Sequence, residues 1–585
     1  MRDGVELFTV VHTPNDVSRE YPILLYRTPY SCSPYGADQY RSALGPSHRF
    51  ARDGYVFVYQ DVRGRYLSEG TWIQMTPHIP RKTSPKDTDE STDTYDTIEW
   101  LLENLDHHNG RVGQWGISYP GFYTAAGMIG GHPALKAASP QAPIGDFFFD
   151  DFHHHGAFFL PHAFGFLARH GRDRSGPTTK PGVRFDLGTP DGYEFFLKLG
   201  PLSEVNQTYL DGESSFWEEL VRHPNYDAFW QERSIIPNLK DIACAVMTVG
   251  GWFDAEDLYG PLQIYRAVER NNPEIFNILV MGPWDHGDWG RREGTGLGNA
   301  RFGSPTSDFY RERILVPFFN YHLKQEGELD LPEAYVFETG ANRWRTFEQW
   351  PPTSVREKTL YLRQRGGLSF DPPQAGEEDF GEYLSDPHRP VPFTQEISPE
   401  MTREYMTDDQ RLASRRPDVL SYQTNVLEED LTLAGPIQAE LWVSTSASDA
   451  DWIVKVIDVH PSSAPDPVPN PGQARMGGYQ MLIRSEVIRG RFRNSYERPE
   501  PFIPNRITKV SLPLQDLFHD LKRGHRIMVQ IQSSWFPLVD RNPQKYVPNI
   551  SKAVEADFVS AIHRVYHSPE YPTQLQVSTL GKFPR

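Results

Sequence analysis

The chain has 585 residues, more than a single hydrophobic core usually holds, so two or three domains are expected. Its 59 basic and 77 acidic residues give a net charge of −18. That sign argues against a nucleic-acid partner and would attract a cationic small molecule, although an acidic surface also simply favours solubility. The two cysteines, Cys32 and Cys244, are distant in sequence, which excludes a disulfide framework and a cysteine metal site.

Nothing in the sequence predicts insertion into a membrane, and nothing fixes the compartment. No run of about 18 apolar residues occurs, so a membrane span is not expected. Residues 1–11 (MRDGVELFTVV) already resemble a strand and contain no secretory signal. Either the protein is cytoplasmic or a leader has been removed, and both explanations stay open.

The first 145 residues alternate strand-like and helix-like segments. Apolar runs occur at residues 21–26 (YPILLY), 55–59 (YVFVY) and 112–115 (VGQW). Between the last two, residues 89–105 carry apolar side chains at helical spacing behind a start rich in Ser, Thr and Asp. Short buried strands that alternate with helices predict a parallel sheet with helices on both faces.

From residue 146 to about residue 234 the sequence changes in character. Aromatic residues crowd together, as at 147–149 and 158–159, and strand alternation fades. We interpret this segment as a helical cap that roofs a pocket, because aromatic side chains bury large areas and shape ligand sites. The alternative is that these aromatic residues form only the core of a helical subdomain.

Strand-like runs return at residues 244–249 (CAVMTV) and 278–281 (ILVM), with a helix-like segment at 258–270 between them. Beyond residue 334, short alternating runs punctuated by Pro, Gly and Asp predict an all-β sandwich or jelly roll. The predicted organisation is an α/β domain over residues 1–145 and 235–335, a helical cap over 146–234, and a β jelly roll over 336–585.

The strongest local signal for chemistry is residues 114–121 (QWGISYPG), which follow a predicted strand and precede a helix-like segment. A serine between glycines at such a junction sits on a tight, strained turn that exposes its hydroxyl, and larger residues in place of the glycines would strike the strand and the helix. Ser118 is therefore the candidate nucleophile. Pro120 departs from the usual pattern, which has glycine two residues after the serine.

A serine nucleophile needs a base and a carboxylate that orients the base, and on an α/β-hydrolase sheet these follow in the order Ser, Asp, His. Asp254 follows the run 244–249, and His286 follows the run 278–281, so both are expected at the sheet edge that carries Ser118. Asp285 is a rival for the orienting role, although adjacent side chains rarely converge on one hydrogen bond. The sequence thus predicts a Ser118–His286–Asp254 triad rather than an ordinary loop histidine at position 286.

Six motifs, in their order along the chain, resemble those of the X-prolyl dipeptidyl-peptidase-like serine hydrolases, a family that includes cocaine esterase, glutaryl-cephalosporin acylase and the α-amino-acid ester hydrolases. The motifs are residues 27–30 (RTPY), 61–64 (DVRG), 116–121 (GISYPG), 150–154 (DDFHH), 251–257 (GWFDAED) and 282–286 (GPWDH). In this family Tyr-Pro or Tyr-Glu commonly follows the nucleophile, so Pro120 fits. The resemblance implies an α/β-hydrolase domain with a helical cap and a C-terminal jelly-roll sandwich. It also favours a periplasmic or secreted protein whose leader has been removed.

The resemblance further implies an oxyanion hole formed by the Tyr30 hydroxyl and the Tyr119 backbone N–H. Two fixed donors would stabilise the negative oxygen of the tetrahedral intermediate without reorganisation. On the residues alone, Tyr30 would be taken for a buried tyrosine at the end of a strand.

In α-amino-acid ester hydrolases three carboxylates hold the ammonium group of the substrate, and the matching residues here are Asp151, Glu256 and Asp257. Clustered carboxylates repel one another unless a cation or a shared proton relieves them. The alternative is structural: Asp257 would cap the helix that begins at residue 258, and Asp150 or Asp151 would cap a helix of the cap region.

Three consecutive histidines at 153–155 invite a metal-site hypothesis. Consecutive positions on a helix point in different directions, whereas zinc needs ligands that converge. We therefore expect one of these histidines to line the pocket, and we predict neither a metal nor an organic cofactor.

The expected activity is hydrolysis of, or acyl transfer from, an ester or amide of an α-amino acid with a free amine. Three alternatives stay open: an esterase or acylase for uncharged or carboxylate-bearing acyl groups, an X-prolyl dipeptidyl peptidase, and a non-catalytic polymer-binding protein. The expected partner is this small-molecule substrate, with no nucleic acid and no membrane. Self-association as a homo-oligomer is left open.

Overall fold

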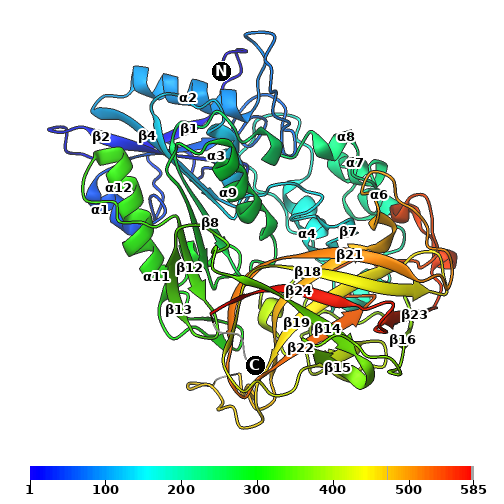
Figure 1. Cartoon of the computed structure of the whole chain (residues 1–585). Helices are drawn as coiled ribbons and strands as arrows, with labels where there is room; N and C mark the ends of the chain where they lie inside the picture. The colour runs from blue at the N-terminus through cyan, green and yellow to red at the C-terminus, as the bar shows by residue number, and fades with distance from the viewer. Residues whose placement is uncertain (471, 582–585) are drawn as a thin grey trace.

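A computed structural model of the chain describes residues 1–470 and 472–581 (Figure 1). Its N-terminal part is built on a nine-stranded sheet with the order β1-β3-β2-β4-β5-β8-β9-β12-β13. These strands are β1 (Thr9–His12), β2 (Tyr21–Thr28), β3 (Val56–Asp61), β4 (His108–Ile117), β5 (Leu135–Gln141), β8 (Ala245–Gly251), β9 (Asn277–Gly282), β12 (Ala334–Glu338) and β13 (Arg343–Phe347). Only the pairings of β1 and β13 are antiparallel, so β4, β8 and β9 end at the same edge of the sheet.

Helices pack on both faces of this sheet, as predicted, and β2 shows why. Ile23 and Leu25 belong to the same buried cluster as Ile98 of a helix on one face. Leu24, between them, belongs to a cluster with Phe50 and Phe319 on the other face. A strand covered on both faces needs apolar residues at consecutive positions rather than alternate ones. The helices around the sheet are α1 (His48–Asp53), α2 (Glu90–Asn104), α3 (Tyr119–Gly127), α9 (Tyr259–Asn271), α10 (Asp288–Arg291), α11 (Thr306–Tyr310) and α12 (Val316–Lys324).

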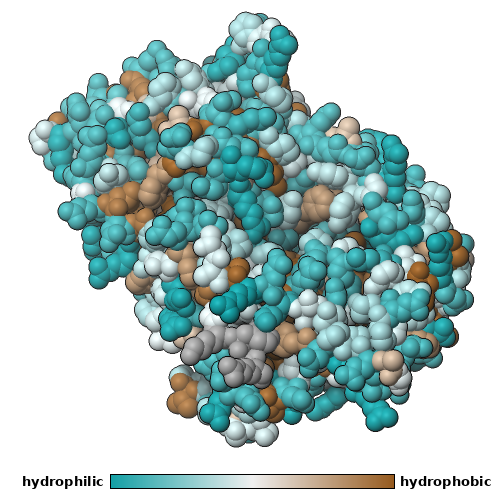
Figure 2. Space-filling model, in the orientation of Figure 1, coloured by the Kyte–Doolittle hydropathy of each residue, from teal (hydrophilic) through white to brown (hydrophobic). Residues whose placement is uncertain are grey.

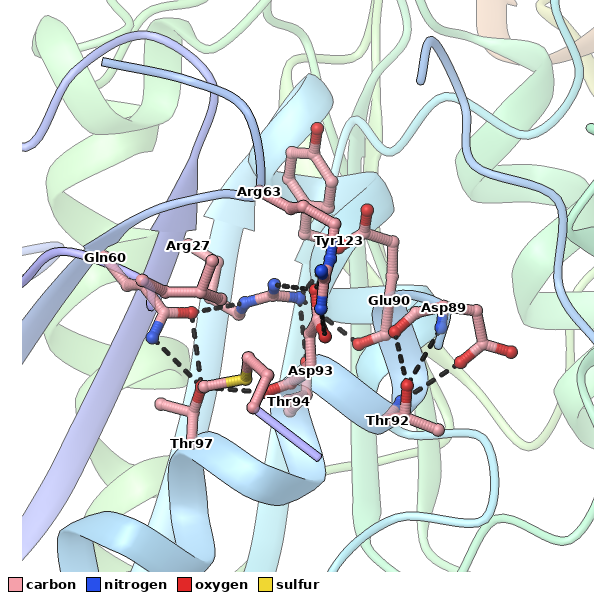
Figure 3. A network of polar contacts seen from close by, with 12 residues as sticks. Arg27, Gln60, Arg63, Asp89, Glu90, Thr92, Asp93, Thr94, Thr97 and Tyr123 are labelled. Carbon is pink, nitrogen blue, oxygen red and sulfur yellow. Dashed lines mark hydrogen bonds and ion pairs between the residues drawn. The ribbon is translucent and has the colours of Figure 1, made fainter. Parts of the chain in front are cut away.

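A buried ionic network joins the end of β2 to the start of α2 (Figure 3). Asp89 caps α2, since its carboxylate accepts the Thr92 N–H while its own N–H donates to the Thr92 hydroxyl. The fully buried guanidinium of Arg27 donates to Glu90 and to Gln60, each over 2.9 Å. Removing one partner of such a buried pair leaves an uncompensated charge, so the network fixes the strand end that leads to residues 28–30.

The insertion between β5 and β8 forms a cap of short elements. They are β6 (His153–His154), β7 (Ala157–Phe158), α4 (Leu160–His170), α5 (Gly192–Leu197), α6 (Val205–Tyr209), α7 (Ser215–Arg222) and α8 (Ala228–Gln231). Some of the aromatic residues build the core of the cap: the rings of Phe147 and Phe152 stack with centroids 4.5 Å apart. Others, including Phe164 and Phe166, line a cavity. Both interpretations of the aromatic segment therefore hold, for different residues.

The C-terminal part is an all-β jelly roll, drawn from green at β14 through yellow to red in Figure 1. The predicted boundary at residue 336 is wrong, because it cuts β12, which pairs in parallel with β9, and because β13 completes the central sheet. The jelly roll begins only at β14. Its strands are β14 (Arg356–Arg363), β15 (Gly367–Ser369), β16 (Phe380–Ser385), β17 (Leu420–Gln423), β18 (Leu431–Thr445), β19 (Asp451–Val459), β20 (Gln480–Arg489), β21 (Thr508–Leu521), β22 (Arg526–Gln532), β23 (Ala561–Tyr566) and β24 (Gln574–Leu580).

Hydrophilic residues dominate the face shown in Figure 2, where hydrophobic residues form small scattered groups. Among the described residues, no helix is both long enough and apolar enough to cross a membrane. A cavity of about 610 Å³ is lined by Ser118, by residues of α4 and by the segment 399–403, which precedes most of the jelly-roll strands. The cap, the sheet edge and the C-terminal domain thus meet at one cavity.

Candidate active site

Ser118 lies on the tight turn between β4 and α3, with a φ of +69° that non-glycine residues rarely adopt. The glycines around it are needed for close packing, as the sequence predicted. A Cβ on Gly116 would lie 2.3 Å from the carbonyl oxygen of Pro120, and one on Gly121 would lie 2.6 Å from that of Gln141. Pro120 itself occupies the first turn of α3, where the missing N–H costs nothing.

His286 follows β9 and lines the cavity, and Asp254 follows β8 and contacts the His286 ring. The His286 Nδ1 lies 3.1 and 3.0 Å from the two carboxylate oxygens of Asp254. Asp254 also accepts the backbone N–H groups of Glu256 and Asp257, each over 2.9 Å. Burial opposes ionisation of Asp254, but the His286 ring and these N–H donors outweigh burial and lower its pKa. Burial also favours the neutral His286 ring, yet Asp254 and Glu256 raise its pKa above the usual value.

Asp285, the rival for the orienting role, makes no hydrogen bond to the His286 ring among the described residues. Its carboxylate lies 3.5 Å from the guanidinium of Arg403, and burial raises the pKa of Asp285 to about 6. The geometry therefore favours Asp254 over Asp285 as the partner of the histidine.

The second nitrogen of His286, Nε2, faces a carboxylate rather than the serine. It lies 3.3 Å from Glu256, and no hydrogen bond joins it to Ser118 in the described part of the chain. Ser118, Glu256 and His286 all line the same cavity. Hydrogen bonds between catalytic groups are often long before substrate binds, so this arrangement is compatible with transfer of the Ser118 proton to His286.

Tyr30 and Tyr119 offer two donors beside Ser118. The Tyr30 hydroxyl is within hydrogen-bonding reach of the Ser118 side chain, and burial, followed by the charge of Asp151, raises the pKa of Tyr30 well above its usual range. Tyr30 therefore keeps its proton and can donate. The Tyr119 hydroxyl points away, donating to Gln74 and accepting the Met75 N–H. Its backbone N–H, at the first position of α3, has no intrahelical acceptor.

Asp150, rather than Asp257, caps helix α9. The Gly260 N–H in the first turn of this helix donates to Asp150 over 2.7 Å, and the Gly145 N–H donates to the same oxygen. The capping alternative is wrong for Asp257, because neither of its carboxylate oxygens has a hydrogen-bond partner among the described residues, although both are buried. For Asp150 the capping role was predicted, but on a helix of the cap; α9 instead packs on the central sheet.

Asp257 lies among other carboxylates behind the cavity wall. Burial and then the charges of Asp150 and Asp151, with further contributions from Asp254 and Glu256, raise its pKa well above the usual range. A buried acid in such surroundings holds a proton unless a cation joins the cluster. Glu256 lines the cavity, whereas Asp151 and Asp257 do not.

Asp151 pairs with His162 of α4, a residue that the sequence analysis missed. The His162 Nε2 contacts the Asp151 carboxylate closely. Burial favours the neutral ring, but Asp151 raises the pKa of His162 to about 9, so the ring carries a positive charge at neutral pH. The Asp151 N–H also donates to the Glu256 carbonyl over 3.1 Å, which ties the cap to the loop after β8. No local sequence pattern indicated a role for His162, because its partner Asp151 lies outside α4 and only the fold brings the two side chains together.

Two arginines of the cavity wall were also missed. Arg291 and Arg403 each place a guanidinium nitrogen 3.4 Å from the backbone carbonyl of His286. Arg403 belongs to a segment without any recognisable motif, more than a hundred residues from His286 in sequence. Only the packing of the C-terminal domain against the sheet edge brings it to the site.

None of the three consecutive histidines lines this cavity, so the expectation that one of them does is wrong. His153 and His154 form the two-residue strand β6. His154 contacts the Glu486 carboxylate over 2.9 Å, and the His155 ring contacts the Val487 carbonyl. These rings fasten the cap to β20 of the jelly roll.

Comparisons of the sequence and the structure with known proteins show which family the chain belongs to. Residues 3–288 match the family model of the X-Pro dipeptidyl-peptidase (S15 family), and residues 328–576 match that of the X-Pro dipeptidyl-peptidase C-terminal non-catalytic domain. An aminopeptidase from the marine sediment archaeon Thaumarchaeota archaeon superposes with a TM-score of 0.91 at 38% identity, covering 99% of this chain and 95% of that one. The chain belongs to the X-Pro dipeptidyl-peptidase-like family.

Two further family members cover nearly the whole chain. The structure of an α-amino acid ester hydrolase matches with a TM-score of 0.90 at 36% identity, over 99% of this chain and 95% of that one. The cocaine esterase of Rhodococcus sp. (strain MB1 Bresler) is 28% identical over 98% of this chain and 96% of its own length. The resemblance seen in the motifs and the predicted fold class are therefore confirmed. The protein is a serine hydrolase of the family that acts on esters or peptides.

Proposed function

We propose that the protein cleaves esters or amides of α-amino acids that carry a free amino group, through an acyl-enzyme on Ser118. In this proposal Ser118 is the nucleophile, His286 its base and Asp254 the carboxylate that orients the base. The Tyr30 hydroxyl and the Tyr119 N–H form the oxyanion hole. Asp151, Glu256 and Asp257 supply the negative charge that attracts the substrate ammonium.

The proposed reaction follows from these roles. His286 accepts the Ser118 proton at Nε2 while Asp254 holds the Nδ1–H and stabilises the imidazolium that forms. The Ser118 oxygen attacks the acyl carbon, and the two donors stabilise the oxyanion. His286 then protonates the departing alcohol or amine. Water releases the acid from the acyl-enzyme, or a second amine intercepts the acyl group.

The buried Asp257 carboxylate is the observation that carries the ammonium proposal. It lacks a hydrogen-bond partner among the described residues and is surrounded by other carboxylates next to the base. An ammonium group bound at Glu256 would bring a positive charge to this cluster and relieve the repulsion among its carboxylates. Bound to Glu256 at the cavity wall, with Asp151 and Asp257 behind it, the ammonium would hold the neighbouring acyl carbon near Ser118.

Glu256 would also couple substrate recognition to activation of the serine. Its carboxylate lies 3.3 Å from His286 Nε2, the nitrogen that must accept the Ser118 proton. An ammonium that draws Glu256 toward itself would free this nitrogen. The names of two relatives, an aminopeptidase and an α-amino acid ester hydrolase, both denote substrates with an α-amino group, which supports this assignment.

Hydrolysis of two matched esters tests the proposal. Phenylglycine methyl ester should have a kcat/KM about 100-fold or more above that of its N-acetylated form, because charge-assisted hydrogen bonds to the ammonium contribute about 1.5–3 kcal/mol each. Equal values would contradict the ammonium site while leaving the serine hydrolase assignment intact.

One observation favours a second candidate, an acylase for acyl groups that bear a carboxylate. Arg291 and Arg403 line the cavity and could pair with such a group. This candidate predicts that glutarate monoesters are cleaved faster than phenylglycine methyl ester, the opposite of the order expected from the acidic cluster.

A further inference from the structure

We propose that Asp458, His460 and His525 of the jelly roll form a binding site for a divalent transition-metal ion, with zinc as the ion that the ligand set fits best. The three side chains offer two imidazole nitrogens and a carboxylate whose ligand atoms all lie within 4.8 Å of one another. Within the described residues this is the one group of three or more such side chains with that spacing.

The ligand atoms are already close to the separations that zinc requires. Bonds of about 2.0–2.2 Å in a tetrahedral site place ligand atoms roughly 3.3–3.6 Å apart. His525 Nδ1 lies 2.7 Å from one oxygen of Asp458, and His460 Nε2 lies 3.7 Å from the other. Both nitrogen–oxygen distances are within an ångström of that separation, and no two of the three ligand atoms are more than 4.8 Å apart.

The third imidazole is the feature that hydrogen bonding alone does not explain. Asp458 is almost fully buried, and its two oxygens already contact the rings of His519, at 3.2 Å, and His525. His460 adds another ring beside the same carboxylate, with centroids only 4.7 Å from the His525 ring. Neither nitrogen of the His460 ring is hydrogen-bonded to another described residue. A metal ion bound between the two rings would take a nitrogen of each as a ligand, and so give His460 the partner that hydrogen bonding does not.

His519 would serve as an outer-shell residue of this site. Its Nε2 contacts Asp458, and its Nδ1 lies 2.8 Å from the Thr339 hydroxyl, which also donates to the Phe518 carbonyl. The ring is thus fixed at both nitrogens and holds the carboxylate in place. Such second contacts orient metal ligands and typically change metal affinity about 10–100-fold when removed.

The proposed metal site is accessible from solvent, and it lies between two connections of the jelly roll that a bound ion would join. A cavity of about 480 Å³ is lined by Asp458, His460, His519 and His525, and the side chains of His460 and His525 are 17% and 16% exposed. Asp458 and His460 lie at the end of β19 and just beyond it, and His525 precedes β22. A bound ion would fasten the long loop after β19 to the turn between β21 and β22.

Titration of the metal-free, full-length enzyme without a histidine tag tests this site. Cobalt(II) serves as the spectroscopic probe, because its visible absorption reports coordination number, and zinc is then added to displace it. We expect one equivalent of each ion to bind and protons to be released on binding. His460→Gln and His525→Gln should each weaken zinc binding by more than about 100-fold, and His519→Gln by about 10–100-fold.

Matched variants separate this site from other histidines and from the hydrolase site. His388 is an exposed histidine with two carboxylates beside it, so His388→Gln should bind zinc as the wild type does. Glu256→Gln should also bind zinc unchanged, which excludes the cavity of Ser118. The proposal is overturned if the wild type binds no zinc below millimolar concentration, or if His460→Gln keeps wild-type affinity. The thermal unfolding of each metal-free variant is recorded first; His460→Gln breaks no hydrogen bond between described side chains, so it is the decisive variant.

Discussion

Two buried aspartates of this protein are each held by imidazoles, but their surroundings differ. Asp254 accepts two backbone N–H groups and a single histidine, His286. Asp458 receives no backbone donor from the described residues and is instead shared by His519 and His525, with His460 nearby. In both clusters the histidine contacts lower the pKa of the carboxyl group despite its burial.

The difference indicates how contacts between an aspartate and histidines can support two kinds of chemistry, proton transfer and metal binding. Where the backbone also satisfies the aspartate, the carboxylate is left with a single ring to orient, which is the arrangement that a proton-transferring histidine needs. Where imidazoles alone satisfy it, several nitrogen ligands gather around one charge, which is the donor set of a metal site. The predictions below test this distinction.

The largest expected effect comes from replacing Asp254, the proposed orienting carboxylate. Asp254→Asn should lower kcat by about 10⁴-fold, because the amide favours the wrong tautomer of His286. Asp285→Asn is the matched control, since that carboxylate makes no hydrogen bond to the ring, and it should change kcat only a few-fold. Both are measured by ester hydrolysis at saturating substrate. A large loss in Asp285→Asn with a small one in Asp254→Asn would reverse the assignment.

Removing one proposed oxyanion donor, the Tyr30 hydroxyl, should have the next largest effect. Tyr30→Phe should lower kcat by about 100-fold or more with little change in KM, because the hydroxyl acts mainly in the transition state. Tyr26 also lines the cavity, so Tyr26→Phe controls for loss of a buried hydroxyl and should stay near wild type. Similar kcat values for the two variants would show that Tyr30 is only structural.

The pH dependence of the reaction should reveal how far the Glu256 carboxylate raises the pKa of His286. Only the neutral ring can accept the Ser118 proton, and Asp254 and Glu256 raise the pKa of His286. The acidic limb of the kcat/KM profile should therefore lie above pH 6.5, the ordinary histidine value. Glu256→Gln should move this limb to lower pH, whereas Asp285→Asn should not. An unmoved limb in Glu256→Gln would mean that its carboxylate does not act on the ring.

The smallest effect is expected on stability, from the His162–Asp151 pair. The folded pKa of His162 is about 9, above the ordinary 6.5, so its stabilising contribution is complete below pH 6.5 and is lost as the pH rises toward 9. The melting temperature should fall over this interval in the wild type and less steeply in His162→Gln. His388→Gln, at the surface, should keep the wild-type slope. Identical slopes in all three proteins would contradict the charged pair.

Most of the fold could be predicted because its signals are local. The apolar run of β2 and the capped start of α2 depend on neighbouring residues, and Ser118 lies between glycines that steric contact requires. The end of the sheet was misjudged because β13 is an edge strand whose mixed burial pattern resembles that of the jelly-roll strands that follow.

The surroundings of the site could not be predicted, because they depend on contacts between distant segments. His162 carries its charge only because the fold sets it against Asp151, and Arg403 arrives from another domain. The capping role of Asp257 was plausible from its position before α9. It failed because Asp150, far away in sequence, already accepts the N–H of that helix.

The central claim, that the acidic cluster selects acyl groups with a free amine, is tested most directly by four values of kcat/KM. Phenylglycine methyl ester and phenylacetic acid methyl ester, which lacks the amine, are each measured with the wild type and with Glu256→Gln at a pH where His286 is neutral. We predict that Glu256→Gln lowers the value for the amino ester by about 10-fold or more, which corresponds to about 1.4 kcal/mol, and leaves the other within about two-fold. An equal loss on both esters, or no loss on either, would contradict the claim.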